Sequence, residues 1–114
     1  MPNRSAITQS PPAAVAQALT RLGRNLRTAR LRRQLRLQDV ADRLGVSRLT
    51  IADLEKGKPS ASAAAYLGAL WSLGLLSQAD NLGDPDLDEE GRILESVRRP
   101  QQARRRRRRL DNDF

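Results

Sequence analysis

The spacing of apolar residues predicts a helical chain. Between residues 14 and 34, small and large apolar residues recur at steps of four and three, as on one buried side of an α-helix. The stripe consists of Ala18, Leu22, Leu26 and Ala29. Further helices are expected over about 37–44, from 47 to about 56, over about 60–73 and over about 87–97.

The second and third of these helices are expected to meet at a sharp turn. Gly45 can adopt the left-handed backbone that such a turn favours, and the small Ala41 lets the next helix cross closely. Ser47 is expected to cap the third helix, whose Ile51 and Leu54 point inward. The residues left to face outward or sideways are Arg48, Leu49, Thr50, Ala52 and Asp53. A helix presented in this way fits the major groove of DNA.

The helix over about 60–73 is rich in apolar residues. We expect its buried face to consist of Ala64, Leu67, Leu70 and Trp71, with Tyr66 at the edge. Core packing of the two aromatic residues is favoured over a ligand pocket.

A fifth element is expected to begin with Leu75, Leu76 and Leu82. These residues offer more apolar surface than a small domain buries alone, which indicates a partner. A two-fold dimer seam would place two reading helices one DNA turn apart, about 34 Å.

Charge is unevenly distributed along the 114 residues, whose net charge is +8. Residues 1–58 hold twelve Lys and Arg against four acids, whereas residues 80–90 hold six acids and no base. Such basic segments favour a polyanionic partner, because each neutralised phosphate releases counterions. We interpret residues 21–27 of the first helix as a solvated basic face, and Arg32, Arg33 and Arg36, which lie next to the turn between the second and third helices, as phosphate contacts. The arginines of the first helix, all expected on the surface, are Arg21, Arg24, Arg27, Arg30, Arg32 and Arg33.

Composition also argues against several kinds of site. The chain has no Cys and no His, so it lacks a disulfide framework, thiolate metal ligands and the usual general base. We therefore expect no enzymatic activity, no cofactor and no metal site. The longest apolar stretch, residues 63–71, is far shorter than the roughly 20 residues that span a bilayer. We expect a soluble cytoplasmic protein.

The predicted organisation has four parts. Residues 1–12 are expected to form a flexible arm that does not nucleate a helix, because Pro2, Pro11 and Pro12 stand among polar residues. Residues 13–82 would form the DNA-binding domain, residues 83–99 an acidic helical extension and residues 100–114 a disordered basic tail. The six consecutive arginines of the tail are Arg104, Arg105, Arg106, Arg107, Arg108 and Arg109. They could bind DNA nonspecifically, dock on an acidic protein, fold back on residues 80–90, or remain solvated.

The residues around the turn carry a resemblance to a known family. Leu44-Gly45-Val46-Ser47, Ile51 and Leu54-Glu55-Lys56-Gly57-Lys58 are similar to the helix-turn-helix of the Cro/C1-type (Xre) transcriptional regulators. The similarity covers about residues 22–75. It implies an all-α, five-helix, lambda-repressor-like domain that binds double-stranded operator DNA as a homodimer and reads bases with its third helix.

By position, this resemblance places three residues at base edges. Arg48 can donate two hydrogen bonds to guanine, and Leu49 suits a thymine methyl group. Asp53 could accept from cytosine N4, or could instead pair with Arg48 or a neighbouring basic residue. The residues expected at the DNA backbone, or in mixed roles, are Arg36, Gln38, Ser47, Thr50, Lys56 and Lys58. Many family members have Thr-Gln where this chain has Arg36-Leu37, so Arg36 and Gln38 replace that cap and backbone contact only in part.

The segment after residue 73 resembles the tail of HipB-type antitoxins. The similarity rests on Leu73-Gly74-Leu75, Asp84-Pro85 and Glu89-Glu90-Gly91. It implies a HipA-like kinase toxin as a partner and repression of a shared operon. The sequence thus predicts an operator-binding repressor that also neutralises a toxin. The alternatives are a regulator without a toxin and a general nucleic-acid binder that depends on the arginine tail.

Overall fold

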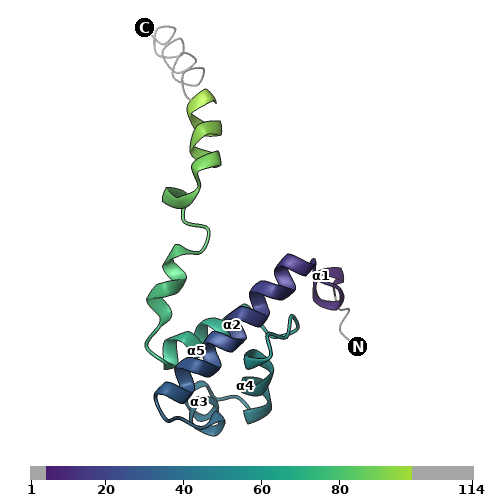
Figure 1. The fold of residues 1–114 in the computed structure, drawn as a ribbon, viewed down its shortest axis with the longest axis vertical. Coiled ribbons are helices and arrows are strands. Elements are labelled where there is room, and N and C mark those ends of the chain that lie inside the picture. Colours follow the sequence, from purple (N-terminus) through teal and green to yellow (C-terminus); the bar gives the residue numbers. More distant parts are fainter. Residues whose placement is uncertain (1–4, 99–114) are drawn as a thin grey trace, which may run out of the picture. The chain divides into compact units, whose positions relative to one another are not determined.

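Helices are the only regular elements among residues 5–98, the part of the chain that the computed structural model describes (Figure 1). The all-α class expected from the sequence is confirmed. The α-helices are α1 (Ala6–Gln9), α2 (Ala13–Arg32), α3 (Leu37–Leu44), α4 (Arg48–Glu55) and α5 (Ala63–Ser72). Two 3-10 helices follow, η1 (Leu76–Asn81) and η2 (Pro85–Leu87), and residues 89–98 are again α-helical.

The chain divides into two units, residues 1–79 and 80–114. This division falls close to the limit expected at residue 82. The flexibility expected for residues 1–12 and 100–114 stays a prediction, and Arg104 to Arg109 lie outside the described residues.

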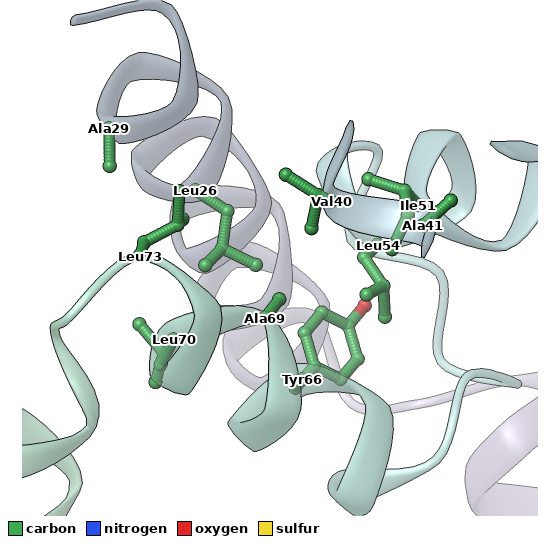
Figure 2. Close-up of a cluster of buried hydrophobic side chains, with 10 residues drawn as sticks. All are labelled: Leu26, Ala29, Val40, Ala41, Ile51, Leu54, Tyr66, Ala69, Leu70 and Leu73. Atoms are coloured by element: carbon green, nitrogen blue, oxygen red, sulfur yellow. The ribbon is translucent and has the colours of Figure 1, made fainter. Parts of the chain in front are cut away.

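The core of the first unit lies where α2, α3, α4 and α5 meet (Figure 2). Ile51 and Leu54 of α4 and Val40 of α3 are its most deeply buried large side chains. Ala41 is fully buried, as its small size predicts. The complete buried set is Leu26, Ala29, Val40, Ala41, Ile51, Leu54, Tyr66, Ala69, Leu70 and Leu73.

The predicted buried face of α5 is wrong by a rotation of the helix. Trp71 is 60% exposed and Leu67 is 37% exposed, whereas Tyr66 is only 6% exposed. Ala64 is exposed as well, so only Leu70 of the predicted set is buried. The physical reason is that apolar residues surround this helix on all sides, so their spacing does not indicate which side packs inward.

Two smaller expectations need correction. Ala6–Gln9 is helical, although residues 1–12 were expected to form no helix; Ser5 opens this turn, because its carbonyl accepts from the backbone N–H of Thr8 and Gln9. Ala18 is exposed, and Leu19 packs against the core instead. The fifth element, whose type the sequence left open, is the 3-10 helix η1; Leu76 and Leu82 are exposed, whereas Leu75 packs against the core.

In the described part of the second unit, an aspartate side chain caps the start of each helical segment. Asp84 accepts from the backbone N–H of Asp86 at 2.9 Å and starts η2. Asp88 accepts from the backbone N–H of Gly91 at 3.0 Å and starts the helix over residues 89–98. The helix expected over 87–97 therefore begins only at residue 89, because the Asp88 carboxylate caps its start. Leu87 belongs to η2 instead.

Candidate nucleic-acid interface

The turn between α3 and α4 depends on the backbone of Gly45. Its φ of 67° and ψ of 33° lie in the left-handed region, as the sequence predicts. A side chain at this position would meet no atom within 4 Å, so glycine is favoured by the backbone angle and not by space. The N–H of Val46 donates to the carbonyl of Ala41 at 3.1 Å, which closes the end of α3.

Ser47 caps α4, as the sequence predicts. Its hydroxyl accepts from the N–H of Thr50 at 3.2 Å, and the two hydroxyl oxygens lie 3.0 Å apart. α4 therefore begins at Arg48 with a satisfied first turn.

The outer face of α4 presents Arg48 and Leu49 to solvent. Leu49 is 67% exposed and Arg48 is exposed, while Ile51 and Leu54 fix the opposite face in the core. Beside Arg48 lies a shallow surface hollow whose lining also includes α3 residues. The residues around it are Arg30, Arg36, Leu37, Gln38 and Arg48. This arrangement provides an accessible cationic side chain and an apolar one on a rigid helix.

Asp53 lies beside Lys58. Its Oδ1 is buried and lies 3.1 Å from Lys58 Nζ, an ion pair in an orientation too oblique for a hydrogen bond. Tyr66 holds the same loop, because its hydroxyl donates to the Lys58 carbonyl at 2.9 Å. Burial raises the pKa of Tyr66, and the negative charge of Asp53 raises it further. The loop after α4 is thus held in place from two sides.

At the start of α3, Arg36 is joined to Asp39 twice. The Arg36 backbone N–H donates to Asp39 Oδ2 at 2.7 Å, and its guanidinium Nη2 lies 3.2 Å from Asp39 Oδ1. These contacts hold the pKa of Asp39 below its usual range. A carboxylate three residues into the helix thereby satisfies the helix start that lacks a Thr cap. Next to it, the Gln38 amide donates to Asp42 at 2.7 Å.

The end of α4 is held by an ion pair that the sequence analysis missed. Arg30 Nε donates to Glu55 Oε2 at 2.7 Å and Arg30 Nη2 to Glu55 Oε1 at 2.9 Å, with side chains only 10% and 9% exposed. Arg30 Nη1 also donates to the Leu35 carbonyl at 2.9 Å. Arg30 thus links α2, the loop before α3 and the end of α4. Glu55 raises the pKa of the guanidinium chiefly by hydrogen bonding, against the opposing effect of burial.

The expectation that Arg30 belongs to the surface is therefore wrong. The spacing contained a signal, since Arg30 stands four residues after Leu26 on the buried stripe of α2. Gly23 provides a second signal, because a side chain there would lie 2.6 Å from the carbonyl oxygens of Leu54 and Glu55. An arginine and a glycine on an apolar stripe mark the place where α4 contacts α2.

The charge of the first unit agrees with a polyanionic ligand. Its described part, residues 5–79, holds eleven Lys and Arg against four Asp and Glu. Among residues 5–98, no helix combines the length and apolar character needed to cross a bilayer. Within the same range, no group of three His, Cys, Asp or Glu side chains could hold a metal ion.

Comparison with known families agrees with this geometry. A family model described as a helix-turn-helix domain matches residues 21–80, which include α3, the Gly45 turn and α4. The chain belongs to this helix-turn-helix family. No curated protein and no solved structure matches it. Membership of the helix-turn-helix family supports a DNA-binding regulator, with α4 in the position of the second helix of the motif.

Proposed function

We propose that the protein is a sequence-specific repressor that binds double-stranded operator DNA in the cytoplasm. The observation that carries this proposal is the exposure of Arg48 and Leu49 on α4, a helix fixed at both ends by Ser47 and by the Arg30–Glu55 pair. A helix of this kind can enter the major groove with its first residues at the bases.

Arg48 and Leu49 are the proposed base readers. The Arg48 guanidinium would donate to O6 and N7 of a guanine, a contact worth about 1–3 kcal/mol of discrimination. Leu49 would pack on a thymine methyl group. Of the alternatives that the sequence left open for Asp53, we favour pairing with a neighbouring basic side chain, because the ion pair with Lys58 occupies the buried oxygen of Asp53.

The remaining polar residues are proposed to position the protein on the DNA backbone. Asp53 contacts the Lys58 side chain and Tyr66 binds the Lys58 carbonyl, so both hold Lys58 in place. Asp39 holds the Arg36 side chain in the same way. Such contacts supply affinity and register rather than base selectivity. The full proposed set is Arg36, Gln38, Ser47, Thr50, Lys56 and Lys58.

We further propose that the operator-binding form is a homodimer. Trp71 and Leu67, four residues apart on α5, are exposed apolar side chains of the first unit, and so is Leu76 of η1. A two-fold contact would cover these side chains and present two copies of α4 to two half-sites.

The reading helix is tested by selecting binding sites from a random duplex library and then measuring single variants. Arg48→Ala should lower discrimination at one guanine position by about tenfold to a hundredfold. Leu49→Ala should relax a thymine preference. Arg27→Ala, which removes the same charge from the solvated face of α2, should change the affinity little and leave the sequence preference intact. Unchanged affinity and selectivity in the Arg48→Ala, Leu49→Ala double variant would refute α4 as the reader.

A role as the antitoxin of a HipA-like kinase is a second candidate. The similarity of residues 73–91 to HipB-type tails favours it, and the acidic side chains of residues 80–95 are the proposed toxin contact. Loss of co-purification with an adjacently encoded kinase-like protein, on deletion of residues 84–114, would support this role. Unchanged co-purification would show that the contact lies elsewhere, and absence of such a protein would favour a regulator without a toxin.

A further inference from the structure

The helix over residues 89–98 carries an apolar side that is largely exposed in the described part of the chain. Ile93, Leu94 and Val97 are each more than half exposed, and so is Leu87 just before the helix. At about 3.6 residues per turn, the three helical residues fall within roughly 100° of arc. None of them belongs to the core cluster of the first unit. An apolar side of this kind on so short a helix indicates a surface that another chain covers.

The start of this helix is shaped closely around Asp88 and Gly91. The Asp88 carboxylate accepts from the Gly91 N–H at 3.0 Å, and a side chain at Gly91 would run into that carboxylate. The Asp88 carboxylate therefore fills the space beside Gly91, one turn before Leu94.

The two ends of the same segment differ in charge. Its start is acidic, its end is basic at Arg98 and Arg99, and Arg92 and Glu95 lie between the two ends. The acidic residues of the start are Asp84, Asp86, Asp88, Glu89 and Glu90. Two copies aligned in the same direction would bring like charges together. Two copies aligned in opposite directions would bring each acidic start to a basic end, which also favours the helix dipoles.

We propose that the helix over residues 89–98 pairs with the same helix of a second copy in antiparallel orientation, centred on Leu94. Glu90 and Arg98 each stand four residues from Leu94, so they face each other across the pair, twice by symmetry. The pairing is a contact between two identical surfaces, as a two-fold axis requires.

The charge order is what favours a second copy over an unrelated partner. A toxin or another surface of this chain could cover the apolar residues, and the helix dipole alone favours an acidic start and a basic end. Neither of these requires opposite charges at equal distances from Leu94, as Glu90 and Arg98 are. The contact involves neither α4 nor the α5 surface, and it forms without DNA. Its failure would thus leave the proposed operator binding untouched.

The absence of cysteine from the chain allows a direct test by disulfide formation. Leu94→Cys and Ser96→Cys are made separately in the full chain and equilibrated in a glutathione buffer without DNA. Both positions are exposed, and Ser96 lies outside the apolar arc. Because a cysteine at 94 would meet itself across the axis, Leu94→Cys should give at least about tenfold more covalent dimer than Ser96→Cys. Equal yields would overturn the pairing.

Charge variants on the Leu94→Cys background test the partner and the orientation. Glu90→Arg gives a copy that is basic at both positions, and Arg98→Glu gives one that is acidic at both. When these copies are mixed, mass spectrometry should find more mixed disulfide than random pairing gives; random proportions would overturn self-pairing. Neutralising both charges with Glu90→Gln and Arg98→Gln should lower the yield of an antiparallel pair, whereas a higher yield would indicate a parallel one and overturn the proposed orientation. Each variant should keep the thermal unfolding of the first unit, whose core contains none of these residues.

Discussion

At the residue scale, the Arg30–Glu55 ion pair is the contact most sensitive to substitution. Both side chains are about nine-tenths buried, so removal of one leaves a charge without its partner in the interior. We expect Arg30→Met to lower the free energy of unfolding by about 3–5 kcal/mol, measured by urea denaturation.

Two controls separate the buried charge from the loss of volume. Arg30→Met combined with Glu55→Met should recover much of the loss, since a buried pair replaced by apolar groups costs little. Arg36→Met breaks an ion pair whose arginine side chain is 82% exposed, and it should lower the free energy of unfolding far less than Arg30→Met does, because solvent screens an exposed pair. A double variant as unstable as the single one would contradict this account of the pair.

Tyr66 makes stability depend on pH in the alkaline range. Burial raises the pKa of its hydroxyl above the usual value, so the folded protein holds this proton more tightly than the unfolded chain does. The resulting stabilisation is complete below a pH of about 10 and is lost as the pH rises through the folded pKa.

Tyr66→Phe removes the titrating group together with its hydrogen bond to the Lys58 carbonyl. We expect this variant to be less stable than the natural chain by about 1 kcal/mol near neutral pH. The difference should shrink as the pH rises above about 10, because the natural chain then loses the same donor. Denaturant titrations at several pH values measure this, and a constant difference would argue against the titration of Tyr66.

At the scale of elements, two glycines hold the helices of the first unit for different reasons. Gly45 has a positive φ and open space around it, whereas Gly23 is helical and touches the backbone at the end of α4. Gly45→Ala should cost about 1–2 kcal/mol through backbone strain alone. Gly23→Ala should cost more, although alanine is the better helix former, because two helix backbones must separate.

DNA binding distinguishes the two glycine variants further. Separation of α2 from α4 would move the end of the helix that we propose reads DNA, so Gly23→Ala should weaken the proposed operator binding even at temperatures where it remains folded. Equal losses of stability in the two variants, measured by thermal unfolding, would contradict the close contact at Gly23.

The predictability of each helix followed from how much contrast its sequence contains. α3 and α4 were placed correctly because Gly45, Ser47 and the inward Ile51 and Leu54 each allow one role. In α5 almost every residue is apolar, so the spacing does not indicate which side of the helix faces the core. The two aromatic residues were therefore assigned to the wrong sides. The Arg30–Glu55 pair was missed because an arginine among many arginines reads as surface, and only its distance from Leu26 indicated otherwise.

At the scale of the whole molecule, charge alternates along the sequence. Residues 5–79 are basic, residues 80–98 hold seven acids against two arginines, and the six arginines at 104–109 follow. If the last group contacts DNA, removal of residues 100–114 should make the salt dependence of binding shallower by about 0.9 for each phosphate released. Titrations at several salt concentrations measure this slope. An unchanged slope would leave the first unit as the sole source of phosphate contacts.

The exposure of Trp71 also makes it an optical reporter. It is the only tryptophan of the chain, and it lies outside the core. Its fluorescence should therefore change little when the core melts and should shift to the blue when another surface covers α5. Emission spectra recorded over a dilution series would thus follow assembly, while the single buried tyrosine, Tyr66, follows unfolding. One chain carries separate built-in signals for the two events.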